Sequence, residues 1–283
     1  MILSSLGIEL KKLFSRPRTY LGLIGAGLIP LTIIIIFQFK DPTPFIAKTL
    51  GNMFTLSGSI LNGYLVSLIT LNHGTINFFL PVLIVLVVGE LIAGECQEGT
   101  IRLLLSRPIQ RYQLLTAKLI SAVIYTLLLF LIMIAIGLGI GLLVFGQGSL
   151  FITGFFLGND GWFNVLDSGA ALQRLLMVYG ASFLILLTVT SFSFFLSSIL
   201  RNPITAIIFP LVLIIFFRII SAFPFLSEIK PYLFTTYMDL WVDLLAPEIP
   251  WKEIARSMSI LIIHSGLFIA GSFIIFSKKD IIS

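Results

Sequence analysis

The hydrophobic residues of this chain gather in long runs that are separated by short polar segments. A helix needs about 20 mostly apolar residues to cross a bilayer, and six runs are long enough. They predict membrane-spanning helices at residues 20–39, 77–93, 114–145, 172–200, 204–223 and 257–276. The third and fourth runs are longer than a hydrocarbon core of about 30 Å requires, so these helices should tilt or extend beyond it. The pattern predicts an all-α polytopic membrane protein.

The run Leu56–Leu71 is a weaker candidate for a seventh span, because it includes Ser57, Gly58, Ser59, Asn62 and Gly63. A seventh span would also carry the arginines of residues 94–113 to the outside, whereas cations gather on the cytoplasmic side. We therefore expect a helical element that lies outside the membrane or in its plane. A spanning or re-entrant segment is the alternative.

Lysine and arginine set the orientation of the predicted bundle. Of the 18 lysines and arginines, eleven fall on the side that holds both termini, six fall on the other side, and Arg218 lies within a span. Both termini are therefore expected in the cytoplasm. The external segments then cover about residues 40–76, 146–171 and 224–256, and the longest cytoplasmic loop covers about 94–113.

The first 19 residues are expected to form a separate element before the transmembrane domain of residues 20–283. Leucines fall at alternating three- and four-residue spacing, which is one helical face: Leu3, Leu6, Leu10 and Leu13. The charged residues Glu9, Lys11 and Lys12 lie off this face. The pattern predicts an amphipathic helix on the cytoplasmic leaflet, joined to the first span by a corner at Pro17.

The external segments at 146–171 and 224–256 are rich in aromatic residues, including Trp162, Trp241 and Trp251. Amphipathic aromatic side chains settle at the level of the lipid headgroups. We expect short helices here that lie against the outer leaflet, with their rings at its surface. A substrate exit gate is the alternative interpretation of the same residues.

Composition excludes several classes of protein. Hydrophobic residues make up 58% of the chain and charged residues only 11%, which leaves little room for a soluble catalytic domain. Cys96 is the only cysteine, so no intrachain disulfide can form. A net charge of +5 in a membrane protein indicates orientation and contact with anionic lipid rather than nucleic acid.

Searches for catalytic patterns find none. The histidines are His73 and His264, and neither has a carboxylate or cysteine at metal-ligand spacing. Neither a phosphate-binding loop nor a GxSxG nucleophile turn is present. We therefore expect that the chain is not an enzyme and that it holds neither a metal nor a cofactor of its own. We expect His264, inside the last span, to be packed, neutral and hydrogen-bonded; a proton relay is the alternative.

Arg218 is the one cation expected to be buried within a span. A charge at mid-bilayer costs roughly 2.5–3.5 kcal/mol on insertion scales, so the side chain should reach outward or face protein. A role in contacting an anionic substrate in a transport pathway is the minor alternative.

The segment from Glu90 to Lys118 is the most unusual part of the chain. It holds three carboxylates and four cations between two membrane-grade runs: Glu90, Glu95, Glu98, Arg102, Arg107, Arg111 and Lys118. Periodicity predicts a helix over Glu95–Arg107, with an apolar stripe at Ile101, Leu104 and Leu105, an ion pair from Glu98 to Arg102, and an end at Pro108. Topology requires cations but not acids, so the carboxylates favour a surface that binds a partner.

The run Glu95–Pro108, followed by Arg111 and Lys118, resembles the signature of membrane subunits of ABC transporters. The class is the second export type, which has six spans in each subunit. The layout is also similar, with an interfacial N-terminal helix, both ends cytoplasmic, and an external helical segment before the last span. The sequence departs from the pattern at Ala117, where many members have glycine before the lysine.

The resemblance implies that the first cytoplasmic loop forms a coupling helix that docks on a separate ABC ATPase subunit, which binds ATP and Mg²⁺. It implies the following docking residues: Glu95, Glu98, Gly99, Thr100, Ile101, Arg102, Leu104, Leu105, Arg107, Pro108 and Arg111. It also implies a second permease subunit, either identical or a close relative. The expected location is the cytoplasmic membrane of a prokaryote, with lipids around the spans, and the usual direction is export.

Two other functions stay open. One is a non-transporting membrane scaffold or maturation factor that recruits a cytoplasmic partner through the 94–113 loop. The other is an intramembrane enzyme acting on lipid, which the residue inventory argues against. The sequence does not indicate which substrate would be carried.

Overall fold

The computed structural model describes residues 2–40, 61–99, 111–154 and 162–278. Within these ranges, six helical segments are long and apolar enough to cross a membrane, which confirms the six predicted spans and the all-α class. They are α2 (Pro17–Phe39), Thr75–Gln97, Arg111–Phe145, α10 (Ser168–Ile199), α11 (Pro203–Ala222) and α13 (Trp251–Lys278). The predicted bounds differ from these mainly at the helix starts.

Two of the spans consist of consecutive helical elements. The second span comprises η2 (Thr75–Phe79), α5 (Leu80–Val88) and α6 (Glu90–Gln97), and the third comprises α8 (Arg111–Ile134), η3 (Ala135–Ile140) and α9 (Gly141–Phe145). Both η2 and η3 are π-helical. The change from π- to α-helix lies beside Pro81, which lacks a backbone N–H.

Helix α10 and the Thr75–Gln97 segment are the most buried spans and form the centre of the bundle. Helix α10 packs against α5, α6, α8, α11 and α13. Hydroxyl groups link it to its neighbours: Thr126 and Thr190 lie 2.8 Å apart between α8 and α10, and the Ser265 hydroxyl donates to Thr188 at 3.0 Å. Small hydroxyl residues therefore serve tight helix packing within the chain.

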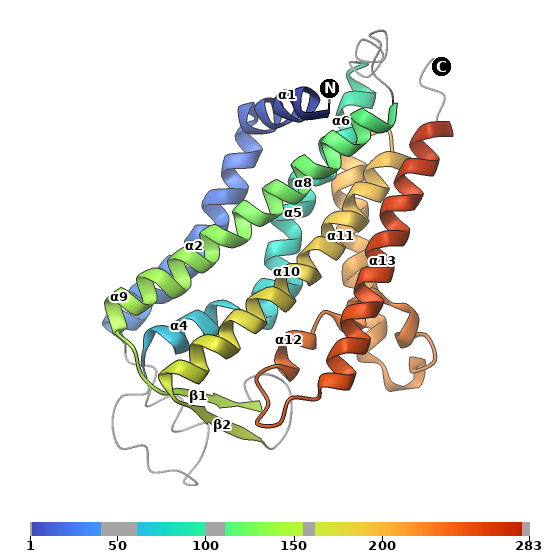
Figure 1. The fold of residues 1–283 in the computed structure, drawn as a ribbon. Helices are drawn as coiled ribbons and strands as arrows, with labels where there is room; N and C mark the ends of the chain where they lie inside the picture. The colour runs from blue at the N-terminus through green and yellow to red at the C-terminus, as the bar shows by residue number, and fades with distance from the viewer. Residues whose placement is uncertain (1, 41–60, 100–110, 155–161, 279–283) are drawn as a thin grey trace.

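Figure 1 shows that the elements at the two ends of the bundle differ. One end, which we call the α1 end, holds α1 (Ile2–Ser15), α6, the start of α8 and the last turn of α13. The other end, which we call the hairpin end, holds α4 (Gly63–Thr70), the strands β1 (Leu150–Thr153) and β2 (Phe163–Leu166), and α12 (Leu240–Asp243).

Helix α1 meets α2 at the predicted corner. Arg16 is extended, with φ −89° and ψ 129°, and Pro17 begins α2. Helix α1 packs against α8, so it is more than a surface anchor. The prediction that Glu9 lies off the buried face is wrong, because Glu9 is only 4% exposed. Its carboxylate is buried because it forms an ion pair with Lys118 of α8.

Helix α4 lies across the bundle rather than along it (Figure 1). Its eight residues span only about 12 Å, too short to cross a bilayer. The non-spanning interpretation is therefore confirmed for residues 63–70, whereas residues 56–60 lie outside the described ranges. Gly63 makes close packing possible here, because a Cβ at this position would lie 2.5 Å from the backbone of Leu142.

The structure differs from the sequence prediction at residues 146–154 and 162–171. We expected a short helix, but β1 and β2 pair antiparallel, with Leu150 opposite Leu166 and Thr153 opposite Phe163. Aromatic and β-branched residues make up three of the four residues of β1 and two of the four of β2, and they suit a half-buried strand. Sequence periodicity is ambiguous over so short a run.

The segment before α13 is helical, as predicted. It contains η5 (Pro224–Leu226), η6 (Lys230–Tyr232), η7 (Phe234–Tyr237) and α12. Tyr232 and Trp251 are exposed, as expected for interfacial rings, but Trp241 is fully buried, so the expected surface position of this residue is wrong.

Candidate functional site

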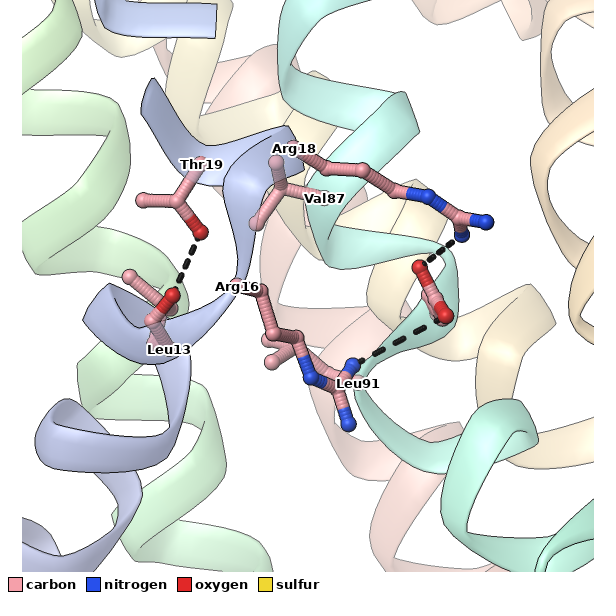
Figure 2. Close-up of a pocket in the computed structure, with 7 residues that line it drawn as sticks. Leu13, Arg16, Arg18, Thr19, Val87 and Leu91 are labelled. Atoms are coloured by element: carbon pink, nitrogen blue, oxygen red, sulfur yellow. Dashed lines mark hydrogen bonds and ion pairs between the residues drawn. The ribbon is translucent and has the colours of Figure 1, made fainter. Parts of the chain in front are cut away.

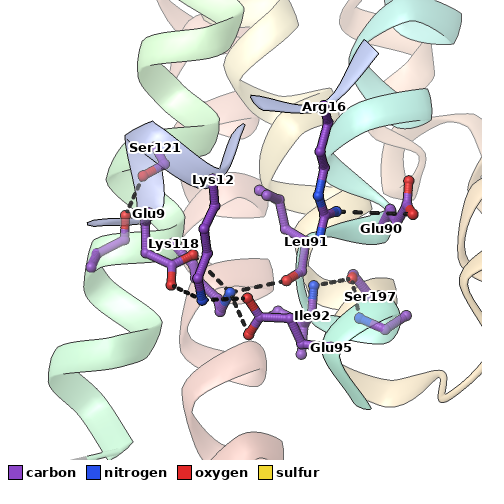
Figure 3. Close-up of polar contacts among 12 residues, drawn as sticks. Glu9, Lys12, Arg16, Glu90, Leu91, Ile92, Glu95, Lys118, Ser121 and Ser197 are labelled. Atoms are coloured by element: carbon purple, nitrogen blue, oxygen red, sulfur yellow. Dashed lines mark hydrogen bonds and ion pairs between the residues drawn. The ribbon is translucent and has the colours of Figure 1, made fainter. Parts of the chain in front are cut away.

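Four charged side chains from three helices meet at the α1 end of the bundle. Lys118 of α8 lies 2.8 Å from both Glu9 of α1 and Glu95 of α6. Lys12 of α1 lies 3.3 Å from Glu9 and 3.1 Å from Glu95. Figure 3 shows the two lysines and two carboxylates converging between the helices. We call these four residues the ion cluster.

The ion cluster is electrically neutral and mostly removed from water. The Lys118 side chain is 1% exposed and those of Glu9 and Glu95 are each 4% exposed. Lys118 also donates to the Leu91 carbonyl at 3.2 Å. Burying charges costs several kcal/mol for each ion unless partners surround them. Each of the three buried groups has at least two partners. These charges are all paired only when the three helices α1, α6 and α8 are packed together.

Lys12 forms the solvent side of the cluster, with 37% of its side chain exposed. Burial alone would lower the pKa of Lys12, but the carboxylates of Glu95 and Glu9 outweigh this effect and raise the pKa above its usual value. Lys12 is therefore charged at physiological pH.

Local helix geometry explains how the sequence places these groups. Glu9 and Lys12 are three residues apart on one face of α1, and Leu91 and Glu95 are four residues apart on α6. Helix α6 is also held at its first turn, where the N–H groups of Ile92 and Ala93 each donate to the Ser197 hydroxyl of α10 at 3.2 Å. Ser197 thus satisfies donors that lack partners at a helix start.

A second set of contacts ties the α1–α2 corner to α6. Arg18 forms an ion pair and hydrogen bond with Glu90, and Arg16 lies 3.9 Å from the same carboxylate. Glu90 is the first residue of α6, so its charge also suits the positive end of that helix. A carboxylate near the hydrocarbon boundary is costly unless paired, and Glu90 is paired with two arginines.

Helix α6 ends sooner than the sequence predicts. Its last residue is Gln97, Glu98 caps it by donating its N–H to the Gly94 carbonyl at 3.0 Å, and Gly99 has φ +71°. A left-handed residue ends an α-helix, so the predicted continuous helix from Glu95 to Arg107 is wrong at Gly99. Arg102, the expected partner of Glu98 in a helical ion pair, lies outside the described residues.

The predicted docking residues occupy different environments. Glu98 is exposed at the tip of α6. Glu95 is 3% exposed and engaged with two lysines, so its carboxylate does not face a partner, and the docking role assigned to it does not fit this position. Arg111 begins α8 and donates to the Ser277 carbonyl at 3.0 Å, at the negative end of α13. The remaining predicted residues lie outside the described ranges: Thr100, Ile101, Arg102, Leu104, Leu105, Arg107 and Pro108.

The Arg218 side chain faces protein. The sequence predicted that it would either do so or reach outward from the membrane. It contacts Asp239 at 2.8 Å and donates to the Thr235 carbonyl at 3.1 Å. Asp239 also accepts from Asn77 at 2.6 Å and lies 3.0 Å from the His73 ring. Burial alone would raise the pKa of Asp239, but its hydrogen bonds with His73 and Arg218 lower it to about 2. The sequence singled out Arg218 but not these other groups, which come from two further segments, at residues 73–77 and 235–239.

His264 is packed and hydrogen-bonded, as predicted. Its Nδ1 lies 2.8 Å from the Ile260 carbonyl and its Nε2 lies 3.2 Å from the Tyr232 carbonyl. Over residues 2–40, 61–99, 111–154 and 162–278, no group of three His, Cys, Asp or Glu side chains could hold a metal ion.

Comparison with known proteins places the chain among membrane proteins. Residues 27–282 match a family described as "Protein of unknown function (DUF2705)". The chain belongs to this family. A Bacillus subtilis (strain 168) protein named "Uncharacterized membrane protein YdbK" is 26% identical over 280 residues, which cover 95% of this chain and 99% of that protein. With its six apolar helices, the chain is an integral membrane protein.

A second Bacillus subtilis (strain 168) relative, "Uncharacterized protein YhcI", is 29% identical over 201 residues. These residues cover 70% of this chain and 63% of that relative, so the match spans less than two thirds of the relative's length. In this DUF2705 member the ion cluster joins two parts of the chain: Glu95 and Lys118 lie within the family match, whereas Glu9 and Lys12 precede it.

Proposed function

We propose that this chain is the membrane-spanning permease subunit of an ATP-driven exporter and receives its energy from a separate ATPase subunit. The observation that carries the proposal is the position of the signature segment. Its exposed residue Glu98 stands at the tip of α6, and its last residue, Lys118, is buried against that same helix. A partner that binds between these residues would act on both helices together.

The ion cluster couples the movements of α6, α8 and α1. Displacing α6 relative to α8 would separate Glu95 from Lys118 and leave buried charges without partners, which is strongly unfavourable. The two helices therefore move as one unit, and Glu9 and Lys12 carry α1 with them. ATP binding on the partner would bias this unit between two states, as a ligand does when its affinity differs between them.

The roles of the predicted residues follow from these positions. Glu98 and the segment of residues 100–108 provide the docking surface, and Arg111 lies at its edge beside the end of α13. Glu95 and Lys118 act as positioning residues that transmit the displacement. ATP and Mg²⁺ are held by the partner, two permease subunits complete the transporter, and the ATPase end of the bundle faces the cytoplasm.

The proposal is tested by purifying the tagged chain in mild detergent after co-expression with its neighbouring genes. A nucleotide-binding chain should co-purify. Glu98→Ala should reduce its recovery several-fold while leaving the elution profile of the permease unchanged, because Glu98 is exposed. The matched control, Glu248→Ala, removes an exposed carboxylate at the hairpin end. Retention of a partner that lacks ATPase activity would instead support the scaffold function.

A further inference from the structure

A small cavity opens beside the α1–α2 corner. It is lined by Leu13, Arg16, Arg18, Thr19, Val87, Glu90 and Leu91, and it encloses about 220 Å³ including the part open to solvent. The enclosed part is only about 10 Å³, the room of a single water molecule, so a ligand would sit at the mouth of the cavity rather than inside it. Figure 2 shows Arg16 and Arg18 at this cavity, and both arginines contact the Glu90 carboxylate.

The charges around this cavity do not balance. Two guanidinium groups face one carboxylate, which leaves one net positive charge. Each guanidinium carries five N–H donors, and 53% of the Arg18 side chain and 30% of the Arg16 side chain are exposed. Donors therefore remain available to an anion that approaches from the surface. The N-terminus of α2, which begins at Pro17, adds the favourable end of a helix dipole.

The cavity also has an apolar side, and apolar side chains are exposed nearby on α2. Leu13, Val87 and Leu91 line its wall. Beyond it, Leu21 and Ile24 of α2 are 64% and 59% exposed. Leu21 lies three residues after Arg18, on the same side of the helix. An anion at the arginines would therefore lie directly above an exposed hydrocarbon surface.

We propose that Arg16 and Arg18 form a binding site for the phosphate of an anionic phospholipid, whose acyl chains lie along α2. The corner lies between a helix at the membrane surface and a helix that crosses the membrane, which is the depth of the headgroups. Arginine binds phosphate through a planar fork of donors, and basic pockets at the ends of spans suit anionic headgroups. Glu90 holds the two guanidinium groups close together and competes with the phosphate for them.

The arginine site is connected to helix α6 through Glu90. Glu90 begins α6, the helix that carries Glu95 and ends at Glu98. A phosphate that draws Arg16 and Arg18 from Glu90 would loosen the contact between the corner and α6. The bound lipid would thus act on the same helix as the proposed ATPase, although lipid binding itself is independent of that proposal.

The test is native mass spectrometry of the purified full chain, titrated with phosphatidylglycerol and with phosphatidylcholine of the same acyl chains. We expect selective binding of phosphatidylglycerol, about fivefold weaker in Arg16→Gln or Arg18→Gln and roughly 25-fold weaker in the double variant. Glu90→Gln should strengthen binding, because the competing carboxylate is gone. Lys11→Gln is the matched control: it removes one cation of α1 that does not line the cavity, and binding should stay within about twofold.

Three results would overturn the proposal. They are equal binding of the two lipids, unchanged phosphatidylglycerol binding in the double variant, and displacement of the lipid by inorganic phosphate at equal concentration, which would indicate a site for the free anion. If the double variant fails to fold, Arg16→Lys with Arg18→Lys keeps both charges and loses the fork geometry. That variant should still bind more weakly than the wild type, and unchanged binding would contradict the assignment.

Discussion

The Lys118 ammonium lies 2.8 Å from the Glu95 carboxylate in a place where both side chains are almost wholly removed from solvent. This pair joins α6 to α8 at the point where the chain leaves one span and enters the next. A separation of the two helices at this end would expose or unpair both charges, so the pair makes the two spans a single mechanical unit.

Lys118→Met should be strongly destabilising. It leaves Glu9 and Glu95 buried with only Lys12 to neutralise them, and removing one partner of a buried ion pair costs about 3–5 kcal/mol. We expect a large fall in the thermal unfolding temperature of the purified protein in detergent.

Lys12→Met is the matched comparison, because Lys12 contacts the same two carboxylates but is 37% exposed. Exposed ion pairs contribute about 0–1 kcal/mol, so the unfolding temperature should fall far less than in Lys118→Met. Equal losses in the two variants would contradict the picture of a buried cluster with one solvent-facing member.

Gly89→Ala should destabilise the junction of α5 and α6. A Cβ at this position would lie 2.5 Å from the carbonyl oxygen of Ala206, a backbone atom of α11 that cannot move alone. Overpacking of this kind costs about 1–3 kcal/mol. Gly180→Ala is the control, since a Cβ there meets nothing within 4 Å and alanine favours a helix. Thermal unfolding should separate the two variants, and similar temperatures would contradict the close approach of α6 and α11.

Asp239 should contribute to stability in a pH-dependent way. Its folded pKa is about 2, below the ordinary value of 3.8, so its contribution is fully present above about pH 4 and is lost as the pH falls through 2. The difference in unfolding temperature between the wild type and Asp239→Asn should therefore be constant near neutral pH and shrink between pH 4 and pH 2. A difference that does not depend on pH would count against the contacts with Arg218 and His73.

Asp243 is the control for Asp239, because its pKa is shifted in the opposite direction. Burial and the neighbouring charges of Asp239 and Glu253 raise the pKa of Asp243. Its charged form is disfavoured in the fold, so Asp243→Asn should not lower stability at neutral pH. If Asp243→Asn lowered stability as much as Asp239→Asn, the loss would reflect poor packing of the asparagine side chain rather than the charge of Asp239.

The spans were predictable from the sequence because each depends on a local property, the length of an apolar run. The corner at Pro17 was also local, since proline fixes the start of α2. The strands β1 and β2 were missed because four residues carry too little periodicity to distinguish a strand from a short helix.

The ion cluster was only half predictable. Glu95 and Lys118 stood out as charges beside the membrane, but Lys12 is 83 residues away from Glu95 in the chain, and no local pattern indicates that they meet. Glu9 was placed on the wrong face because an amphipathic pattern assumes that charges face water, whereas a buried partner reverses that preference. The turn at Gly99 could have been suspected from glycine at a helix end, but the positive φ required the structure.

The most direct test of the central claim is a cross-link from the tip of α6. Because Cys96 is the only cysteine, Cys96→Ser provides a background for a single new thiol. Glu98→Cys in this background, treated with a short bismaleimide in membranes that contain the neighbouring gene products, should link to a chain whose peptides include a phosphate-binding loop. Glu248→Cys at the hairpin end should not form this link. Absence of any nucleotide-binding chain at position 98, with the thiol shown to be reactive, would contradict the proposed ATPase docking.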